Sequence, residues 1–269
     1  MELPDLSQEY PLSAENVAAY RANGHILLRD VASPEEMAAY GPAIVEAAIR
    51  YNTEHRALEE RDTYKKAFLQ IMNLWACDDA DAVRRFVLAR RFAKIAADLM
   101  GVERVRLYHD QALFKEAGGG YTPWHQDQHY WPLDTDQTIT MWMPLVDVTP
   151  EMGVLHFASG SHTSGSLGEF PISDESQDVF RRFIAERGFR LSQSQPMAAG
   201  DATFHSGWVL HAAAPNTTDT IRKAMTMIYY PDGARVVNPV GEGRQKDLAR
   251  WLPGCKPGDL AASELNPVV

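Results

Sequence analysis

Short segments with strand-like residue patterns follow one another through the second half of the chain, and this succession limits the possible folds more than any other feature. Turn signals such as Ser159-Gly160 and Pro231-Asp232-Gly233 separate the segments. Many short strands joined by tight turns are typical of antiparallel sandwiches and barrels. The predicted strands span residues 105–116, 122–128, 138–146, 153–158, 189–194, 202–205, 208–213 and 223–230, with a helical insertion near 174–187.

The first 101 residues follow a different, mainly helical pattern, with one short strand predicted over residues 25–31. The run Ser33-Pro34-Glu35-Glu36 is typical of a helix start, because it places Ser at the N-cap, Pro at the first helical position and Glu at the third. Gly41-Pro42 is expected to kink or split the helix that follows. A second long helix is predicted from Asp79 to Met100.

Together these patterns predict an α+β protein with a mainly β core. We expect a single domain over residues 1–269 that is built as a jelly roll, with the N-terminal helices packed on one face. Residues 1–101 would form the helical support and residues 102–231 the jelly-roll core, while residues 232–269 would form an irregular tail.

Composition and charge narrow the classes of function. The net charge of -10 disfavours nucleic acid as a partner, because binding to phosphates depends on an excess of Lys and Arg. Two widely separated cysteines argue against a disulfide framework and against a cysteine-based zinc site. No signal peptide and no membrane span are visible. We therefore expect a cytoplasmic monomer or homodimer that acts on a small molecule.

The segment His125-Gln126-Asp127 is the first candidate for chemistry. In a strand, residues i and i+2 point to the same face, so an imidazole and a carboxylate placed in this way can bind one metal ion. With a second histidine they would form the two-histidine, one-carboxylate set of non-haem Fe(II) oxygenases, which leaves coordination positions open. His211 and His205 are the two candidates for the third ligand.

Arg222 is the second candidate. It opens the strand that follows His211, and Pro215-Asn216 allows the chain to reverse between the two residues. A hairpin would bring Arg222 beside His211, where its guanidinium could hold a carboxylate through two hydrogen bonds.

In type, order and spacing these residues resemble the motif of the phytanoyl-CoA dioxygenase family. The matching segments are WHQDQHYW (124–131), EMGVLHFASGSH (151–162), AGDATFHSGWVLH (199–211) and HAAAPNTTDTIR (211–222). The looser resemblance extends from about residue 15 to 231. It implies a double-stranded β-helix (cupin-like) fold and selects His211, because only His211 has the family's spacing to Asn216 and Arg222. One position departs from the motif: Ala213 stands where many members carry Ser or Thr.

The resemblance implies an oxidoreductase, a dioxygenase that uses Fe(II), 2-oxoglutarate and O2. The triad His125, Asp127 and His211 would bind iron, and Arg222 would anchor 2-oxoglutarate. Hydroxylation of a C–H bond in a small metabolite, with release of succinate and CO2, is the expected reaction. Desaturation, cyclisation and epimerisation are alternatives, whereas Asp127 disfavours halogenation. A cupin-like metal enzyme without 2-oxoglutarate and a non-catalytic binding protein are the other hypotheses.

Further residues are candidates with weaker support. Four of them are expected near the co-substrate, although a core role is the favoured alternative for Trp142: Gln111, Thr122, Thr140 and Trp142. Three are candidates for contact with the substrate: His129, Trp131 and Lys115. For these the alternatives are an exposed histidine, a core tryptophan and a solvated lysine, respectively.

Overall fold

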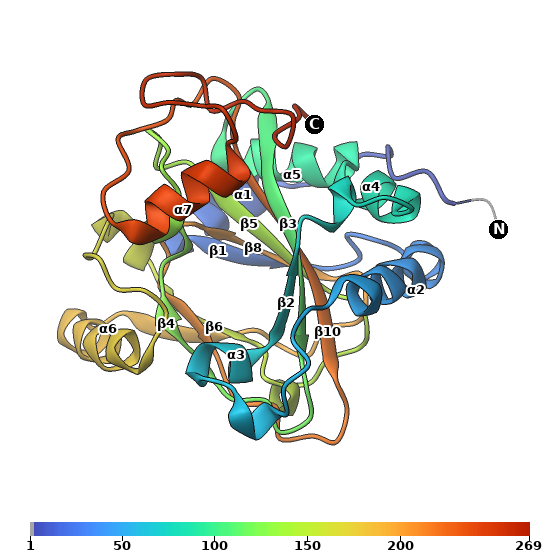
Figure 1. Cartoon of the computed structure of the whole chain (residues 1–269), viewed down its shortest axis with the longest axis horizontal. Coiled ribbons are helices and arrows are strands. Elements are labelled where there is room, and N and C mark those ends of the chain that lie inside the picture. The colour runs from blue at the N-terminus through green and yellow to red at the C-terminus, as the bar shows by residue number, and fades with distance from the viewer. Residues whose placement is uncertain (1–2) are drawn as a thin grey trace.

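Two antiparallel sheets form the centre of the protein in the computed structural model, which describes residues 3–269 (Figure 1). The larger sheet has the strand order β1-β8-β5-β10-β3-β2, and the smaller sheet has the order β4-β9-β6-β7. The strands are β1 (His25–Leu28), β2 (Leu69–Met72), β3 (Val105–Lys115), β4 (Thr122–His125), β5 (Ile139–Pro144), β6 (Leu155–Ser159), β7 (Arg190–Gln193), β8 (Ala202–Ser206), β9 (His211–Ala213) and β10 (Arg222–Pro231).

Seven α-helices surround the sheets in the described chain: α1 (Ala14–Asn23), α2 (Pro34–Tyr51), α3 (Thr63–Ala67), α4 (Asp81–Val87), α5 (Arg90–Met100), α6 (Asp174–Arg187) and α7 (Glu242–Trp251). Helix α5 packs against β3, β5 and β10 of the larger sheet, and α6 packs against β4 of the smaller one. The mixed helical and antiparallel-sheet architecture is therefore confirmed. None of the helices in residues 3–269 is long and apolar enough to span a bilayer.

The start of helix α2 follows from local sequence. Ser33 caps α2 by accepting a hydrogen bond from the backbone N–H of Glu36, whose side chain accepts one from the N–H of Ser33 in return. Strands β5 and β8 are buried along their whole length, and the largest hydrophobic cluster joins the N-terminal helices to the larger sheet.

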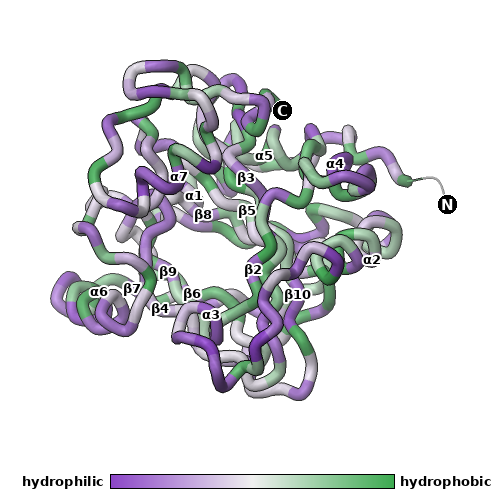
Figure 2. Tube along the Cα trace, in the orientation of Figure 1, coloured by the Kyte–Doolittle hydropathy of each residue, from purple (hydrophilic) through white to green (hydrophobic). Residues whose placement is uncertain are grey.

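Three predicted boundaries were wrong. The helix predicted over 79–100 is two helices, because Ala89 is extended between α4 and α5 and directs Arg91 into a buried ion pair with Glu36. Helix α2 runs through Gly41-Pro42 without a break, so the split that was one of the two predicted outcomes does not occur; Gly41 has no Cβ to clash with the proline ring. The tail predicted as irregular contains α7, a mostly hydrophilic helix in Figure 2.

A cavity of about 550 Å³ lies between the two sheets. Strands β3, β5, β8 and β10 contribute side chains from the larger sheet, and β4, β6 and β9 contribute side chains from the smaller one. Helix α7, together with α3 and β2, lines the same cavity. All of the residues considered below as ligands of a metal or of a co-substrate face this space or border it.

Candidate metal centre

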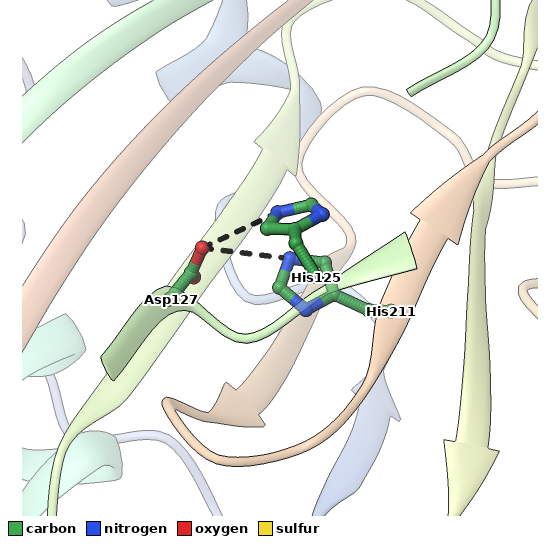
Figure 3. Close-up of side chains that lie close together, drawn as sticks. All are labelled: His125, Asp127 and His211. Atoms are coloured by element: carbon green, nitrogen blue, oxygen red, sulfur yellow. Dashed lines mark ion pairs between the residues drawn. The ribbon is translucent and has the colours of Figure 1, made fainter. Parts of the chain in front are cut away.

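His125, Asp127 and His211 converge in the cavity, with their potential ligand atoms all within 4.8 Å of one another (Figure 3). His125 ends β4, and His211 begins β9. The two strands pair antiparallel with His125 opposite His211, so the sheet register makes the two imidazoles neighbours. Their ring centroids are 4.0 Å apart.

The carboxylate reaches this cluster by a different route from the one predicted. The strand ends at His125, and Asp127 begins a 3-10 turn over Asp127–Tyr130. The alternation of a strand, on which the prediction relied, therefore does not apply at Asp127. Gln126 holds the turn in place, because its side-chain amide donates hydrogen bonds to the carbonyls of Gly165 and Trp208.

Both histidines present Nε2 toward the carboxylate. Their Nδ1 atoms lie 2.7 Å and 3.1 Å from the backbone carbonyls of Pro123 and Val209. This contact requires the proton on Nδ1 and leaves the lone pair of Nε2 free for a metal. The Nε2 atoms lie 3.5 Å and 3.6 Å from Oδ1 of Asp127. Adjacent ligands of an octahedral ion with bonds of about 2.1 Å are roughly 3 Å apart, so a small contraction would close the site.

The second oxygen of Asp127 is held separately. The Thr140 hydroxyl donates a hydrogen bond to Oδ2 at 2.9 Å, and His205 Nε2 lies 3.4 Å from the same atom. His205, the rival third ligand, therefore faces Oδ2 rather than the oxygen shared by His125 and His211. Burial by itself would raise the pKa of Asp127, but the neighbouring imidazoles hold it well below its usual range. An ionised carboxylate suits a cation.

Arg222 is fully buried at the start of β10 without an acidic partner. Its guanidinium donates a hydrogen bond to the carbonyl of Gly153 and lies 5.2 Å from the ring centroid of Trp142, while its Nε atom has no partner among the described residues. No Asp or Glu in residues 3–269 forms an ion pair with it. Burial lowers the pKa of Arg222 to about 9. A buried guanidinium without a counter-ion favours the binding of an anionic ligand.

Two motif residues explain how Arg222 is placed. The side-chain amide of Asn216 donates hydrogen bonds to the carbonyls of Lys115, Glu116 and Thr220, so it fixes the turn that leads into β10. Gly153 has a positive φ of 78°, and a Cβ there would lie 2.3 Å from the carbonyl oxygen of Ala214. Only glycine allows this close approach, which presents the Gly153 carbonyl to Arg222.

The turn Gly160-Ser161-His162, which ends the matching segment 151–162, supports strand β9 rather than lining the cavity. The buried hydroxyl of Ser161 accepts a hydrogen bond from the backbone N–H of Leu210 at 2.8 Å. This contact fixes the residue directly before His211.

The cavity brings together most of the weaker candidates. Gln111, Thr122, Thr140 and Trp142 all line it, as does Trp131. Thr140, however, bonds the carboxylate of Asp127, which differs from the co-substrate contact that we expected.

His129 and Lys115 are not among the residues that line the cavity. His129 faces Glu169 at 3.7 Å. Lys115 is fully buried beside Arg222, its strand partner, and donates to the carbonyl of Gly120. Burial and then the nearby Arg222 charge lower the pKa of Lys115 to about 6. Neither position supports the predicted contact with a substrate.

Sequence reasoning missed the outer part of the cavity. Its walls include Tyr64 of α3, Tyr130 of the 3-10 turn, and Asp247 and Trp251 of α7. His109 also lines the cavity. The spacing of Gly243, Asp247 and Trp251 at i, i+4 and i+8 was the available signal for α7, because it places all three on one helix face.

The residues present fit the groups that the motif implies. Two imidazoles with free Nε2 atoms and an ionised carboxylate form the donor set of a non-haem Fe(II) site with open positions. In the same cavity, the unpaired guanidinium of Arg222 fits one carboxylate of a dicarboxylic acid.

Comparison with known proteins agrees with this geometry. The sequence profile of the family described as phytanoyl-CoA dioxygenase matches residues 20–224. The chain is 25% identical to a probable alpha-ketoglutarate-dependent hypophosphite dioxygenase of Stutzerimonas stutzeri over 157 residues, which are 56% of this chain and 53% of that protein. The chain spans about half the length of the curated relatives it matches.

Two solved structures resemble the whole chain. The non-heme alpha ketoglutarate dependent carbocyclase of nogalamycin biosynthesis is 26% identical, with a TM-score of 0.76 over 96% of this chain and 97% of that one. The epimerase from the same biosynthesis, in complex with Fe3+, alpha ketoglutarate and nogalamycin RO, is 25% identical, with a TM-score of 0.76 over 94% and 97% of the two chains. Since the family profile matches most of its length, this chain belongs to the phytanoyl-CoA dioxygenase family.

Proposed function

We propose that this protein is an Fe(II)- and 2-oxoglutarate-dependent dioxygenase that oxidises a C–H bond of a small molecule. The observation that carries the proposal is the buried, unpaired guanidinium of Arg222 in the same cavity as His125, Asp127 and His211. A metal enzyme that did not use a dicarboxylate would have no need for this cation, whose burial is unfavourable without a counter-ion.

Each residue then has a distinct role. His125, His211 and Oδ1 of Asp127 would hold Fe(II), while Thr140 orients Asp127 through Oδ2. Arg222 would bind the distal carboxylate of 2-oxoglutarate through its free N–H groups, with Trp142 beneath it. Gln111 and Thr122 line the space between these two ends. When bound, iron and 2-oxoglutarate would supply the activation of O2, with succinate and CO2 as products.

The proposed site is compatible with more than one type of C–H oxidation. Hydroxylation is the simplest outcome. Cyclisation and epimerisation are the specific alternatives, because the two structural relatives described above are named as a carbocyclase and an epimerase. The two facing antiparallel sheets with the donor set between them also support a double-stranded β-helix as the finer description of the fold.

Anaerobic calorimetry tests the cofactor assignment directly. We expect 2-oxoglutarate to bind the Fe(II)-loaded protein, and we expect Arg222→Met to weaken that binding about 100-fold. A succinate-release screen over a metabolite library would then identify substrates. Tight binding of Fe(II) without any binding of 2-oxoglutarate would instead favour a cupin-like metal enzyme.

A further inference from the structure

The outer end of the cavity contains a second carboxylate that the proposed chemistry does not use. Asp247 projects from the face of α7 that also carries Gly243 and Trp251, and all three line the cavity. The hydroxyl of Tyr108 donates a hydrogen bond to Oδ2 of Asp247 at 3.3 Å, whereas Oδ1 has no hydrogen-bond donor among residues 3–269. In the same described range, no Lys, Arg or His forms an ion pair with Asp247.

Aromatic rings surround this carboxylate. The ring centroids of Trp251 and His109 lie 4.8 Å apart. Trp251 belongs to the same hydrophobic cluster as Trp131 and Tyr108. Tyr130 packs against this cluster, and its hydroxyl oxygen accepts a hydrogen bond from the backbone N–H of Ile172. The walls of the outer end are therefore mainly aromatic. Ring faces attract both flat apolar groups and cations.

Two basic residues of α7, Lys246 and Arg250, line the cavity only at its exposed rim. Lys246 forms an ion pair with Glu242 at 2.6 Å on the exposed side of the helix. Arg250 is also exposed, and its guanidinium carbon lies 4.4 Å from the ring centroid of Trp251. Burial raises the pKa of Asp247 to about 7, with smaller opposing effects from Tyr108 and Arg250. A cation placed at Oδ1 would compensate this carboxylate.

We propose that the outer end of the cavity binds an organic ammonium group carried on an aromatic or fused-ring substrate, with Asp247 as counter-ion and Tyr130, Trp131 and Trp251 as walls. This inference rests on the proposed function, since it names the substrate class of the same cavity. The cavity volume of about 550 Å³ supports it, because such a space suits a ligand of several rings rather than one of a few atoms.

A small anionic substrate is the alternative, given the hypophosphite relative. It would need free cations near the metal. Arg222 is the one lining cation in residues 3–269 that lies deep in the cavity, and the proposed function already assigns it to the co-substrate. Lys246 and Arg250 are at the exposed rim. The charges therefore favour an amine over an anion.

Three naphthalene probes of different charge test the proposal: 2-(1-naphthyl)ethylamine (cationic), its N-acetyl derivative (neutral) and 1-naphthylacetate (anionic). Their dissociation constants are measured by anaerobic calorimetry on the protein loaded with Fe(II) and 2-oxoglutarate. We expect the amine to bind about tenfold more tightly than the amide, and the acetate to bind most weakly. Asp247→Asn should abolish the preference for the amine and leave the affinity of the amide unchanged.

Glu242→Gln is the matched control, because it makes the same chemical change on the exposed side of the same helix. It should retain the preference. Equal binding of amine and amide by the wild type, tighter binding of the acetate, a preference that survives Asp247→Asn, or no binding of any probe would overturn the proposal. A 2-oxoglutarate titration of each variant separates the two hypotheses. If 2-oxoglutarate does not bind, the proposed function fails; if it binds and the preference is absent, only this inference fails.

Discussion

The inner and outer ends of the cavity differ in how they are built. The inner end consists mainly of side chains on paired strands: His125 and His211 face each other in the register of β4 and β9, and Arg222 begins β10, while Asp127 lies on the 3-10 turn after β4. The outer end is formed by β2 at the edge of the larger sheet and by the helices α3 and α7. Strand pairing positions most of the inner end, whereas packing of side chains positions the helices of the outer end.

This difference teaches where chemistry and selectivity reside. The register of paired strands fixes where each side chain lies, and metal ligands require such precise placement. Helices that cover a sheet can change in length and sequence without disturbing that register. We therefore expect substitutions at the inner end to remove activity or cofactor binding, and substitutions at the outer end to change only which substrate binds.

The largest effect is expected at Asp127. Asp127→Ala removes the only carboxylate of the three-residue donor set, so turnover should fall by at least about 100-fold. Succinate release at saturating Fe(II) and 2-oxoglutarate measures this loss of turnover. Asp219→Ala, a change at an exposed carboxylate before β10, is the control. Unchanged activity in Asp127→Ala would remove the metal site from this position.

Arg222→Met is expected to weaken ligand binding and to increase the stability of the ligand-free protein. The dissociation constant of 2-oxoglutarate should rise about 100-fold. The ligand-free variant should be more stable than the wild type, by about 1 kcal/mol or more, because an uncompensated buried cation is replaced by an apolar group. Thermal melts with and without 2-oxoglutarate measure both effects. A destabilised variant with normal 2-oxoglutarate affinity would show that Arg222 is structural.

Thr140→Val tests whether Thr140 acts through Asp127. Loss of the hydrogen bond to Oδ2 should weaken Fe(II) binding about tenfold, and Thr140→Ser should retain most of the affinity. Anaerobic metal competition provides the measurement. If instead the affinity for 2-oxoglutarate fell while Fe(II) binding stayed normal, Thr140 would contact the co-substrate, as the sequence suggested.

Trp251→Leu tests the outer end. Removing the indole should weaken the neutral N-acetyl naphthyl probe about fivefold, since a stacked aromatic pair contributes roughly 1 kcal/mol. The affinity for 2-oxoglutarate should not change. A parallel loss of 2-oxoglutarate binding would show that the two ends of the cavity are not independent.

Lys115 does not line the cavity, and its expected effect is on the pH dependence of stability rather than on ligand binding. Its pKa is about 6 in the folded protein, against an ordinary value of 10.5. The unfolded chain therefore binds one more proton between these values, so the contribution of Lys115 to stability rises with pH across this window. Lys115→Met should flatten the rise of the melting temperature between pH 6.5 and about 9. An unchanged slope would mean that the ammonium stays charged in the folded state.

Much of the inner site was readable from residue type and spacing. The predicted hairpin between His211 and Arg222 is not formed, because β9 belongs to the smaller sheet and β10 to the larger one. The family spacing from His211 to Asn216 and Arg222 instead reflects one short connection between the two sheets, which residues close together in the chain determine. The cap at Ser33 and the helix over 174–187 were predictable for the same reason. Even there, the strand argument for Asp127 was wrong, since the chain turns after Gln126.

Contacts between distant segments were not readable in this way. Tyr108 and Asp247 are 139 positions apart, and no local pattern connects them. The bond from Thr140 to Asp127 and the packing of α7 over the cavity likewise depend on how whole layers meet. Local sequence sets backbone conformation over a few residues, whereas side-chain packing sums weak contacts from many segments at once. The candidate metal ligands were therefore recognisable from the amino-acid order, and the shape and charge of the outer end of the cavity emerged only on folding.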